Sequence, residues 1–200
     1  MDPRSALVIG VAAAVGAQRL FELRRSTSHL RARGGRGSRA DSSGNWRLLV
    51  AAQTAWILGC AAEPLLRGRP PGWGFLGAGL ALLGAGETLR LLCMRELGRE
   101  WNARAVVPPD LAIVTSGPYR WIRHPNYLGV LLEVVGLGLA AEAWITLLVT
   151  GPLHVLVLRR RMRGEDALLE RIPGYREAMG AKGALLPRFG RRKASGGATT

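Results

Sequence analysis

The residues best suited to do chemistry lie in one run, Gly117 to Gly129, with the sequence GPYRWIRHPNYLG. Proline suits the first turn of a helix, because that turn makes no use of the missing N–H. Pro125 therefore predicts a helix that begins just after His124 and carries Tyr127 in its first turn. Free N–H groups and the positive end of the helix dipole would then face His124, an arrangement that favours an anionic partner.

The run also has a structural interpretation. Trp121 and Arg120, taken alone, are typical of the aromatic and basic belt that anchors a membrane protein at the headgroups. The full run is denser in functional groups than a belt requires, because two tyrosines, a histidine and two arginines adjoin one helix start. We therefore interpret it as a site.

A second pair of candidates follows the last apolar segment, where Arg161 and Glu165 stand four residues apart. A guanidinium group matches the two oxygens of a carboxylate, so Arg161 is suited to orient an acidic acceptor. The alternative is an exposed pair on one helix face, which would stabilise the helix by only about 0.2–0.5 kcal/mol. The two residues taken alone favour this second interpretation.

These residues resemble the isoprenylcysteine carboxyl methyltransferase family of integral membrane methyltransferases. The matching pattern is Gly-Pro-Tyr, a short basic and aromatic spacer, and Arg-His-Pro-x-Tyr, present here as Gly117 to Tyr127, followed by Arg161 and Glu165. The resemblance covers roughly the C-terminal half of the chain. It implies S-adenosylmethionine as the methyl donor and a catalytic or substrate-orienting role for Arg161. The cofactor-binding residues that it implies are Leu111, Ala112, Ile113, Val114, Tyr119, His124, Pro125, Asn126, Tyr127 and Glu165.

Methyl transfer from a sulfonium needs alignment and exclusion of water more than covalent help from the protein. A carboxylate acceptor is already ionised at neutral pH, whereas a phenol, with a pKa near 10, would need a base or a strong positive field. The site lies in a membrane segment without a recognisable protein-docking domain. We therefore expect a lipophilic acceptor, such as an isoprenylcysteine-like group, a small lipid acid or a lipidic phenol.

Three other functions stay open from the sequence. Membrane methyltransferases for lipid amines and NADPH-dependent membrane reductases have similar His-Pro-x-Tyr helix starts. A non-catalytic membrane protein would use the same run only as an anchor. The sequence contains no Gly-x-Gly-x-x-Gly turn after a strand, although a membrane reductase need not have one.

The elements that must position these residues are apolar helices. Five apolar stretches predict an all-α integral membrane bundle of about five transmembrane helices, with the cofactor pocket on the cytoplasmic side. They cover residues 5–23, 46–66, 73–92, 125–140 and 143–158. We expect residues 1–190 to form one methyltransferase domain, with its catalytic half at about 95–187, and residues 191–200 to be a disordered tail.

The formal net charge of +14 lies mostly in loops between the apolar stretches. This distribution favours membrane headgroups over nucleic acid as the partner, and basic loops stay in the cytoplasm. We therefore expect a multi-pass protein of the bacterial inner membrane with its site facing the cytoplasm. Cys60 and Cys93 form no ligand spacing with the three histidines, so we expect no metal and two packed thiols.

Several polar residues fall inside the apolar stretches. Glu87 and Arg90 stand three residues apart, which predicts a paired structural role, with contact to a polar ligand as the alternative. The polar positions at the end of the first stretch, among them Arg19 and Glu22, predict an interfacial helix end, with a functional role for either residue as the alternative. His154 is interpreted as a buried histidine with satisfied hydrogen bonds.

The remaining segments connect these elements. Residues 27–45 are rich in arginine and glycine and predict a flexible connection, with a gate for the substrate as the alternative. A polar helix is expected from Arg159 to about Arg171, and a short amphipathic helix from Tyr175 to Leu186.

Overall fold

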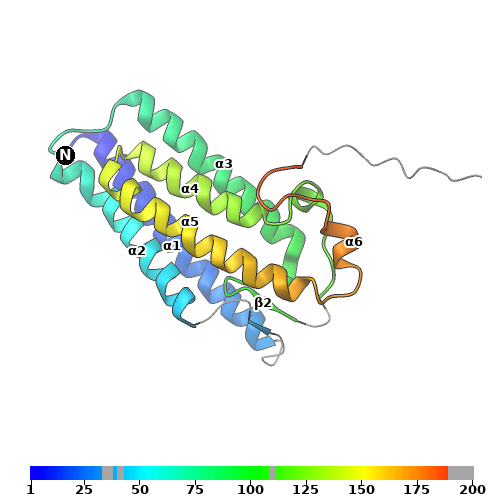
Figure 1. Cartoon of the computed structure of the whole chain (residues 1–200). Helices are drawn as coiled ribbons and strands as arrows, with labels where there is room; N and C mark the ends of the chain where they lie inside the picture. The colour runs from blue at the N-terminus through cyan, green and yellow to red at the C-terminus, as the bar shows by residue number, and fades with distance from the viewer. Residues whose placement is uncertain (33–37, 40–42, 109–110, 189–200) are drawn as a thin grey trace, which may run out of the picture.

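The structure is a computed structural model that describes residues 1–32, 38–39, 43–108 and 111–188. Five long helices form a bundle, and the short elements gather at one end of it (Figure 1). The long helices are α1 (Pro3–Ala32), α2 (Ser43–Leu66), α3 (Trp73–Leu97), α4 (Pro125–Ala140) and α5 (Trp144–Leu169). The short elements are β1 (Ser38–Arg39), η1 (Gly98–Glu100), β2 (Val106–Val107), η2 (Gly117–Arg120) and α6 (Tyr175–Met179).

The prediction of an all-helical membrane bundle is confirmed. Among the described residues, α1, α2 and α3 are each long and apolar enough to cross a membrane. At 16 residues, α4 is about 24 Å long, which is shorter than a hydrocarbon core of about 30 Å. The longer α5 has 26 residues, and its last turns carry Arg159 to Arg161, so it extends beyond the apolar layer.

The core lies where α1, α2, α3 and α4 meet. Buried apolar side chains from these helices surround Leu137 of α4. Trp56 is fully buried and donates its indole N–H to the carbonyl oxygen of Val134 at 3.1 Å, which ties α2 to α4. Cys60 lies in this core and Cys93 is buried near the other end of α3, both as free thiols, which confirms their role as packed side chains.

Glycines allow α3 and α4 to approach closely. A Cβ atom on Gly86 of α3 would lie 2.7 Å from the carbonyl oxygen of Gly129 and 2.9 Å from the side chain of Glu133. Gly77, on the exposed side of the same helix, has no atom within 4 Å of that position. Small residues at such contacts let the helix backbones pack closely in lipid, where the burial of apolar surface alone does not drive helices together.

This difference predicts opposite effects for one substitution at two positions. Gly86→Ala should destabilise the bundle by about 1–3 kcal/mol, because α4 must move away from the new methyl group. Gly77→Ala should leave stability unchanged or raise it by up to about 1 kcal/mol through helix propensity. Thermal unfolding in detergent micelles measures both variants, and an equal loss of stability in the two would contradict the packing described.

The connecting segments differ from the prediction in three ways. First, α1 continues to Ala32, and Ser38 and Arg39 pair antiparallel with Val107 and Val106, so part of the segment predicted to be flexible is structured. The rest of that segment, like the predicted tail 191–200, lies outside the described residues. Second, α5 runs without a break through Arg159, because the arginines continue the same helix into the aqueous layer.

Third, the predicted helix from Tyr175 to Leu186 is wrong after Met179. The chain turns there, and Gly183 forms a parallel bridge with Ile122. Arg123 and His124 donate their backbone N–H groups to the carbonyl oxygens of Gly183 and Ala184, both at 2.9 Å. These bonds hold the segment just before α4 against the C-terminal part of the chain.

Candidate active site

The start of α4 and the end of α5 meet at one end of the bundle. Tyr127 donates its hydroxyl to the Glu165 carboxylate at 2.6 Å. The imidazole Nε2 of His124 lies 2.8 Å from the Asp166 carboxylate. Pro125 begins α4 as predicted, and α5 stays helical to Leu169, so Glu165 and Asp166 reach the first turn of α4. The two sequence segments that were predicted to share a site are therefore in direct contact.

Arg161 lies one turn before Glu165 and is 3 % exposed. Its Nη2 donates to the carbonyl oxygen of Ala103 at 2.8 Å, and its Nε lies 3.4 Å from the Tyr127 hydroxyl. The guanidinium group lies 5.7 Å from the ring centroid of Tyr127 and 5.8 Å from that of Trp46. The alternative of an exposed pair with Glu165 is wrong, because Arg161 is held inside the protein between two aromatic rings.

The other candidate residues form an apolar cluster beside this contact. Leu111, Ile113 and Val114 pack with Tyr119 and Tyr175, under the last turn of α5. Ala112 is exposed, and residues 111–114 form no regular strand. Burial raises the pKa of Tyr119 above its usual range, so its phenol stays neutral. The cluster supplies an apolar surface next to the polar groups of Tyr127 and Glu165.

A cavity of about 350 Å³ lies between α1, α2, α4 and α5, and its lining includes Tyr127 and Arg161 but not His124 or Glu165. Trp46, Trp101 and Asn126 also line it. The Asn126 Oδ1 atom is buried and has no hydrogen-bond partner among the described residues. Exposed apolar side chains on α1 and α2, among them Leu20, Val50 and Leu58, also line the cavity, which places part of it beside the lipid.

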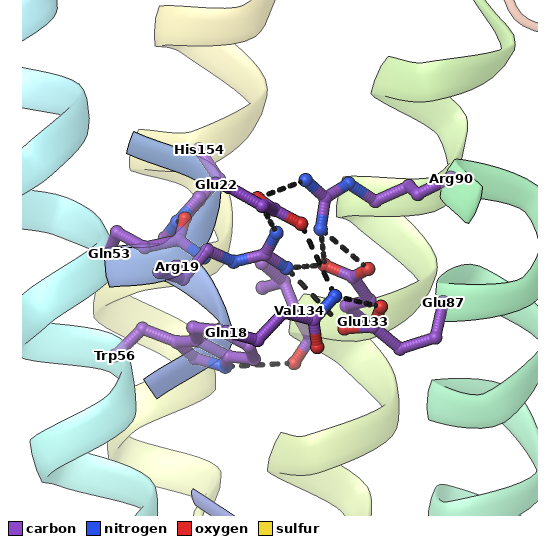
Figure 2. A network of polar contacts seen from close by, with 10 residues as sticks. All are labelled: Gln18, Arg19, Glu22, Gln53, Trp56, Glu87, Arg90, Glu133, Val134 and His154. Carbon is purple, nitrogen blue, oxygen red and sulfur yellow. Dashed lines mark hydrogen bonds and ion pairs between the residues drawn. The ribbon is translucent and has the colours of Figure 1, made fainter. Parts of the chain in front are cut away.

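A buried polar network forms another wall of this cavity (Figure 2). Its charged members are Arg19, Glu22, Glu87, Arg90 and Glu133. Arg90 donates to Glu22 at 2.6 Å and to Glu133 at 3.1 Å, and Arg19 contacts both of these carboxylates. Glu87 accepts a hydrogen bond from Gln18 at 2.5 Å and lies 3.7 Å from Arg19.

The network corrects two predictions from the sequence. Arg90 pairs with Glu22 and Glu133 from other helices, not with Glu87 on its own helix. Arg19 and Glu22 do not form an interfacial helix end, because Glu22 is 4 % exposed and both residues point into the bundle. Charges at membrane depth are costly unless paired, which is why the three helices bring their polar residues together.

His154 is buried, with Nδ1 2.7 Å from the Thr150 carbonyl oxygen and Nε2 3.1 Å from the Gln53 side chain, as predicted for a satisfied histidine. Sequence reasoning missed Asp166, Trp46 and the Ala103 carbonyl as neighbours of the site. Asp166 follows Glu165 directly and could have been found from that position. Trp46 and Ala103 come from distant segments, and no local pattern indicates that they reach Arg161.

Comparisons with known proteins agree with this arrangement. The sequence profile of the isoprenylcysteine carboxyl methyltransferase (ICMT) family matches residues 79–171. YpbQ of Bacillus subtilis is 30% identical over 122 residues, which cover 61% of this chain and 72% of YpbQ. The cobalt-zinc-cadmium resistance protein CzcN of Cupriavidus metallidurans is 32% identical over 155 residues, which cover 73% of this chain and 63% of CzcN.

A solved structure has the same fold. The eukaryotic intramembrane Ras methyltransferase ICMT superposes with a TM-score of 0.61 at 18% sequence identity, covering 90% of this chain and 67% of that one. The matched profile spans most of α3, all of α4 and all of α5, and thus contains the Tyr127, Arg161 and Glu165 contact. By its sequence and by the helices that build this contact, the chain belongs to the isoprenylcysteine carboxyl methyltransferase family.

Proposed function

We propose that this protein transfers a methyl group from S-adenosylmethionine to a carboxylate or hydroxyl oxygen of a lipophilic acceptor. Family membership makes the chain an integral membrane methyltransferase; the donor and the acceptor are the proposed part. One observation carries the proposal. Tyr127 contacts both Glu165 and Arg161, and Tyr127 and Arg161 also line a cavity beside the lipid.

The chemistry of the residues around Glu165 fits the donor. Glu165 is a carboxylate suited to ribose hydroxyls or to the amino group, and His124 lies at a helix start that favours an anionic end. Tyr127 offers an aromatic face for a cationic centre. The Leu111, Ile113 and Val114 wall with Tyr119 suits an adenine ring. Bound donor would supply an activated methyl group on a sulfonium, so these residues need only hold and orient it.

The cavity fits the acceptor. Arg161 is buried and fixed by the Ala103 carbonyl oxygen, which is the arrangement needed to orient one acidic oxygen without paying for rotamer freedom. A carboxylate would enter already ionised. A hydroxyl would enter neutral, beside a positive guanidinium group and the hydrogen bond from Tyr127 to Glu165, which offers its proton a path to a carboxylate.

We place the site on the cytoplasmic side of the bacterial inner membrane, within a single domain of residues 1–190 whose catalytic half is about 95–187. The positive-inside rule supports this orientation. Arg123 precedes α4, Arg163 lies in the last turns of α5 and Arg176 lies in α6, at the end of the bundle that holds the site, whereas the connection between α2 and α3, which carries Arg67 and Arg69, lies at the opposite end (Figure 1).

Cysteine labelling tests the orientation. The native thiols Cys60 and Cys93 are buried, so a membrane-impermeant maleimide should not react with them. In intact bacterial spheroplasts Arg69→Cys should react, and Arg176→Cys should react only after the membrane is permeabilised. The reverse pattern would place the site outside the cell.

The donor assignment is tested by isothermal titration of the purified protein. We expect saturable binding of S-adenosylmethionine that S-adenosylhomocysteine abolishes by competition. Binding of NADPH in its place would indicate a membrane reductase, and no binding of either would indicate a non-catalytic protein. Methyl transfer to lipid amines but not to oxygen acceptors would instead indicate an N-methyltransferase.

A further inference from the structure

The polar network lies on a wall of the acceptor cavity, and the proposed methyl transfer makes no use of it. Arg19, Glu22 and Arg90 line the cavity directly. Glu87 and Glu133 complete the network behind them, together with Gln18. Charged residues at membrane depth that face a cavity, rather than only one another, are expected to contact a polar ligand group.

The network is incomplete in hydrogen bonds. Arg90 is 3 % exposed, yet its Nε donor is buried without a partner among the described residues, and the same holds for the Nε donor of Arg19. Both side chains line the cavity. A buried donor without an acceptor costs free energy, so the protein alone does not satisfy every donor of the network.

The charge of the network limits the chemistry of that ligand group. Two guanidinium groups and three carboxylates leave a formal charge of −1. If the acceptor carried a second carboxylate against the network, it would add to this negative charge, so a dicarboxylate acceptor is disfavoured. An ammonium group would place its positive charge and its own donors against the two guanidinium groups of the network that line the cavity. A hydroxyl accepts from a guanidinium N–H and donates to a carboxylate such as Glu22, so it satisfies both.

The positions of residues along α1 and α4 give the distance between this wall and the level of Arg161 and Tyr127, where the acceptor oxygen would be methylated. Ser26 accepts from the Ala103 N–H at 2.9 Å, and the Ala103 carbonyl oxygen accepts from Arg161, so Ser26 lies level with the site. Glu22 precedes Ser26 by four residues, about 6 Å along α1. On α4, Glu133 follows Tyr127 by six residues, about 9 Å. A separation of about 6–9 Å corresponds to about five to eight bonds of an extended chain.

We propose that the acceptor carries a second, neutral hydroxyl group, about five to eight bonds from the methylated oxygen, which hydrogen-bonds to Arg19, Glu22 and Arg90. This inference rests on the proposed function, because it takes the cavity to be the acceptor site. It assigns the network to substrate selection: an acceptor whose chain is purely apolar places no polar group against the three charged side chains on this wall and binds more weakly.

The test uses three probes that differ at one position: tetradecanoic acid, the same acid with one hydroxyl at its sixth carbon, and the same acid with an amino group there. Binding is measured by titration of the full-length protein in lipid nanodiscs, with S-adenosylhomocysteine present so that no turnover occurs. The hydroxylated acid should bind about ten times more tightly than the plain acid, as expected for one hydrogen bond to a charged group.

Two matched variants locate the effect. Glu22→Gln and Glu87→Gln each neutralise one carboxylate of the network, but only Glu22 lines the cavity. Glu22→Gln should reduce the preference for the hydroxylated acid to about twofold or less, whereas Glu87→Gln should retain it. Titration of each variant with S-adenosylhomocysteine shows whether it has folded.

Four results would each overturn the inference. The plain and hydroxylated acids could bind equally, or neither could bind. The acid with the amino group could bind more tightly than the hydroxylated acid, or the preference could be lost in Glu87→Gln alone. These outcomes are separate from a failure of the proposed function. If the protein does not bind the donor or S-adenosylhomocysteine at all, the methyltransferase proposal fails; if it binds them and the probes do not differ, only the second hydroxyl fails.

Discussion

Replacing Arg161 by alanine is expected to lower kcat for methyl transfer by about 100-fold or more, while the dissociation constant for S-adenosylmethionine stays within about threefold. Arg161 is buried between the rings of Tyr127 and Trp46 and faces the acceptor cavity. Under the proposed function, its removal takes away the positive charge that would orient the reacting oxygen. A radiolabelled methyl assay gives the rate, and titration gives the donor affinity.

Arg163→Ala is the matched control, because Arg163 lies on the same helix but is exposed. It should retain the wild-type rate. Arg161→Lys keeps the charge but loses the planar fork that bonds the Ala103 carbonyl oxygen and reaches the Tyr127 hydroxyl, so its rate should fall between wild type and Arg161→Ala. A wild-type rate in Arg161→Ala would remove Arg161 from the site.

Replacing Glu165 by alanine is expected to weaken binding of S-adenosylmethionine by about 10- to 100-fold, the value of a hydrogen bond to a charged group. The substitution also leaves the Tyr127 hydroxyl without its 2.6 Å acceptor. Isothermal titration measures the change directly. The control is Glu170→Ala, because Glu170 is exposed and follows α5 directly; this variant should bind the donor as the wild-type protein does.

A double-mutant cycle separates the two partners. If Glu165 and Tyr127 act as one unit, the double variant Glu165→Ala with Tyr127→Phe should bind the donor about as weakly as Glu165→Ala alone. Fully additive losses would mean that the two residues contact the donor independently. Donor affinity at the wild-type level in Glu165→Ala would contradict its assignment to the cofactor.

The sequence predicts the part of the site that depends on local rules. Pro125 fixes the start of α4, so the position of Tyr127 in its first turn follows without knowledge of the fold. The spacing of Arg161 and Glu165 places both on one side of α5. Their contact with α4 was expected only from the resemblance to the family, because no local pattern states which helices meet.

The sequence does not predict the partners that packing selects. Glu133 is conspicuous as a glutamate in an apolar stretch, but its partners Arg19 and Arg90 come from two other helices. The spacing of Glu87 and Arg90 predicts a pair within one helix. In the folded bundle Arg90 pairs instead with two more deeply buried carboxylates, those of Glu22 and Glu133. Likewise, Gly183 pairs with Ile122 where continued helix was expected, because those backbone bonds secure the segment that leads into α4.

Transfer of a methyl group from S-adenosylmethionine to a lipid, on which the proposed function depends, can be measured in a single experiment. Purified protein in nanodiscs is incubated with a bacterial lipid extract and S-adenosylmethionine carrying a deuterated methyl group, and the organic phase is analysed by mass spectrometry. A labelled lipid should form with the wild-type protein and with Arg163→Ala but not with Arg161→Ala. A lipid phase without label, in a sample that binds the donor, would contradict the proposed function.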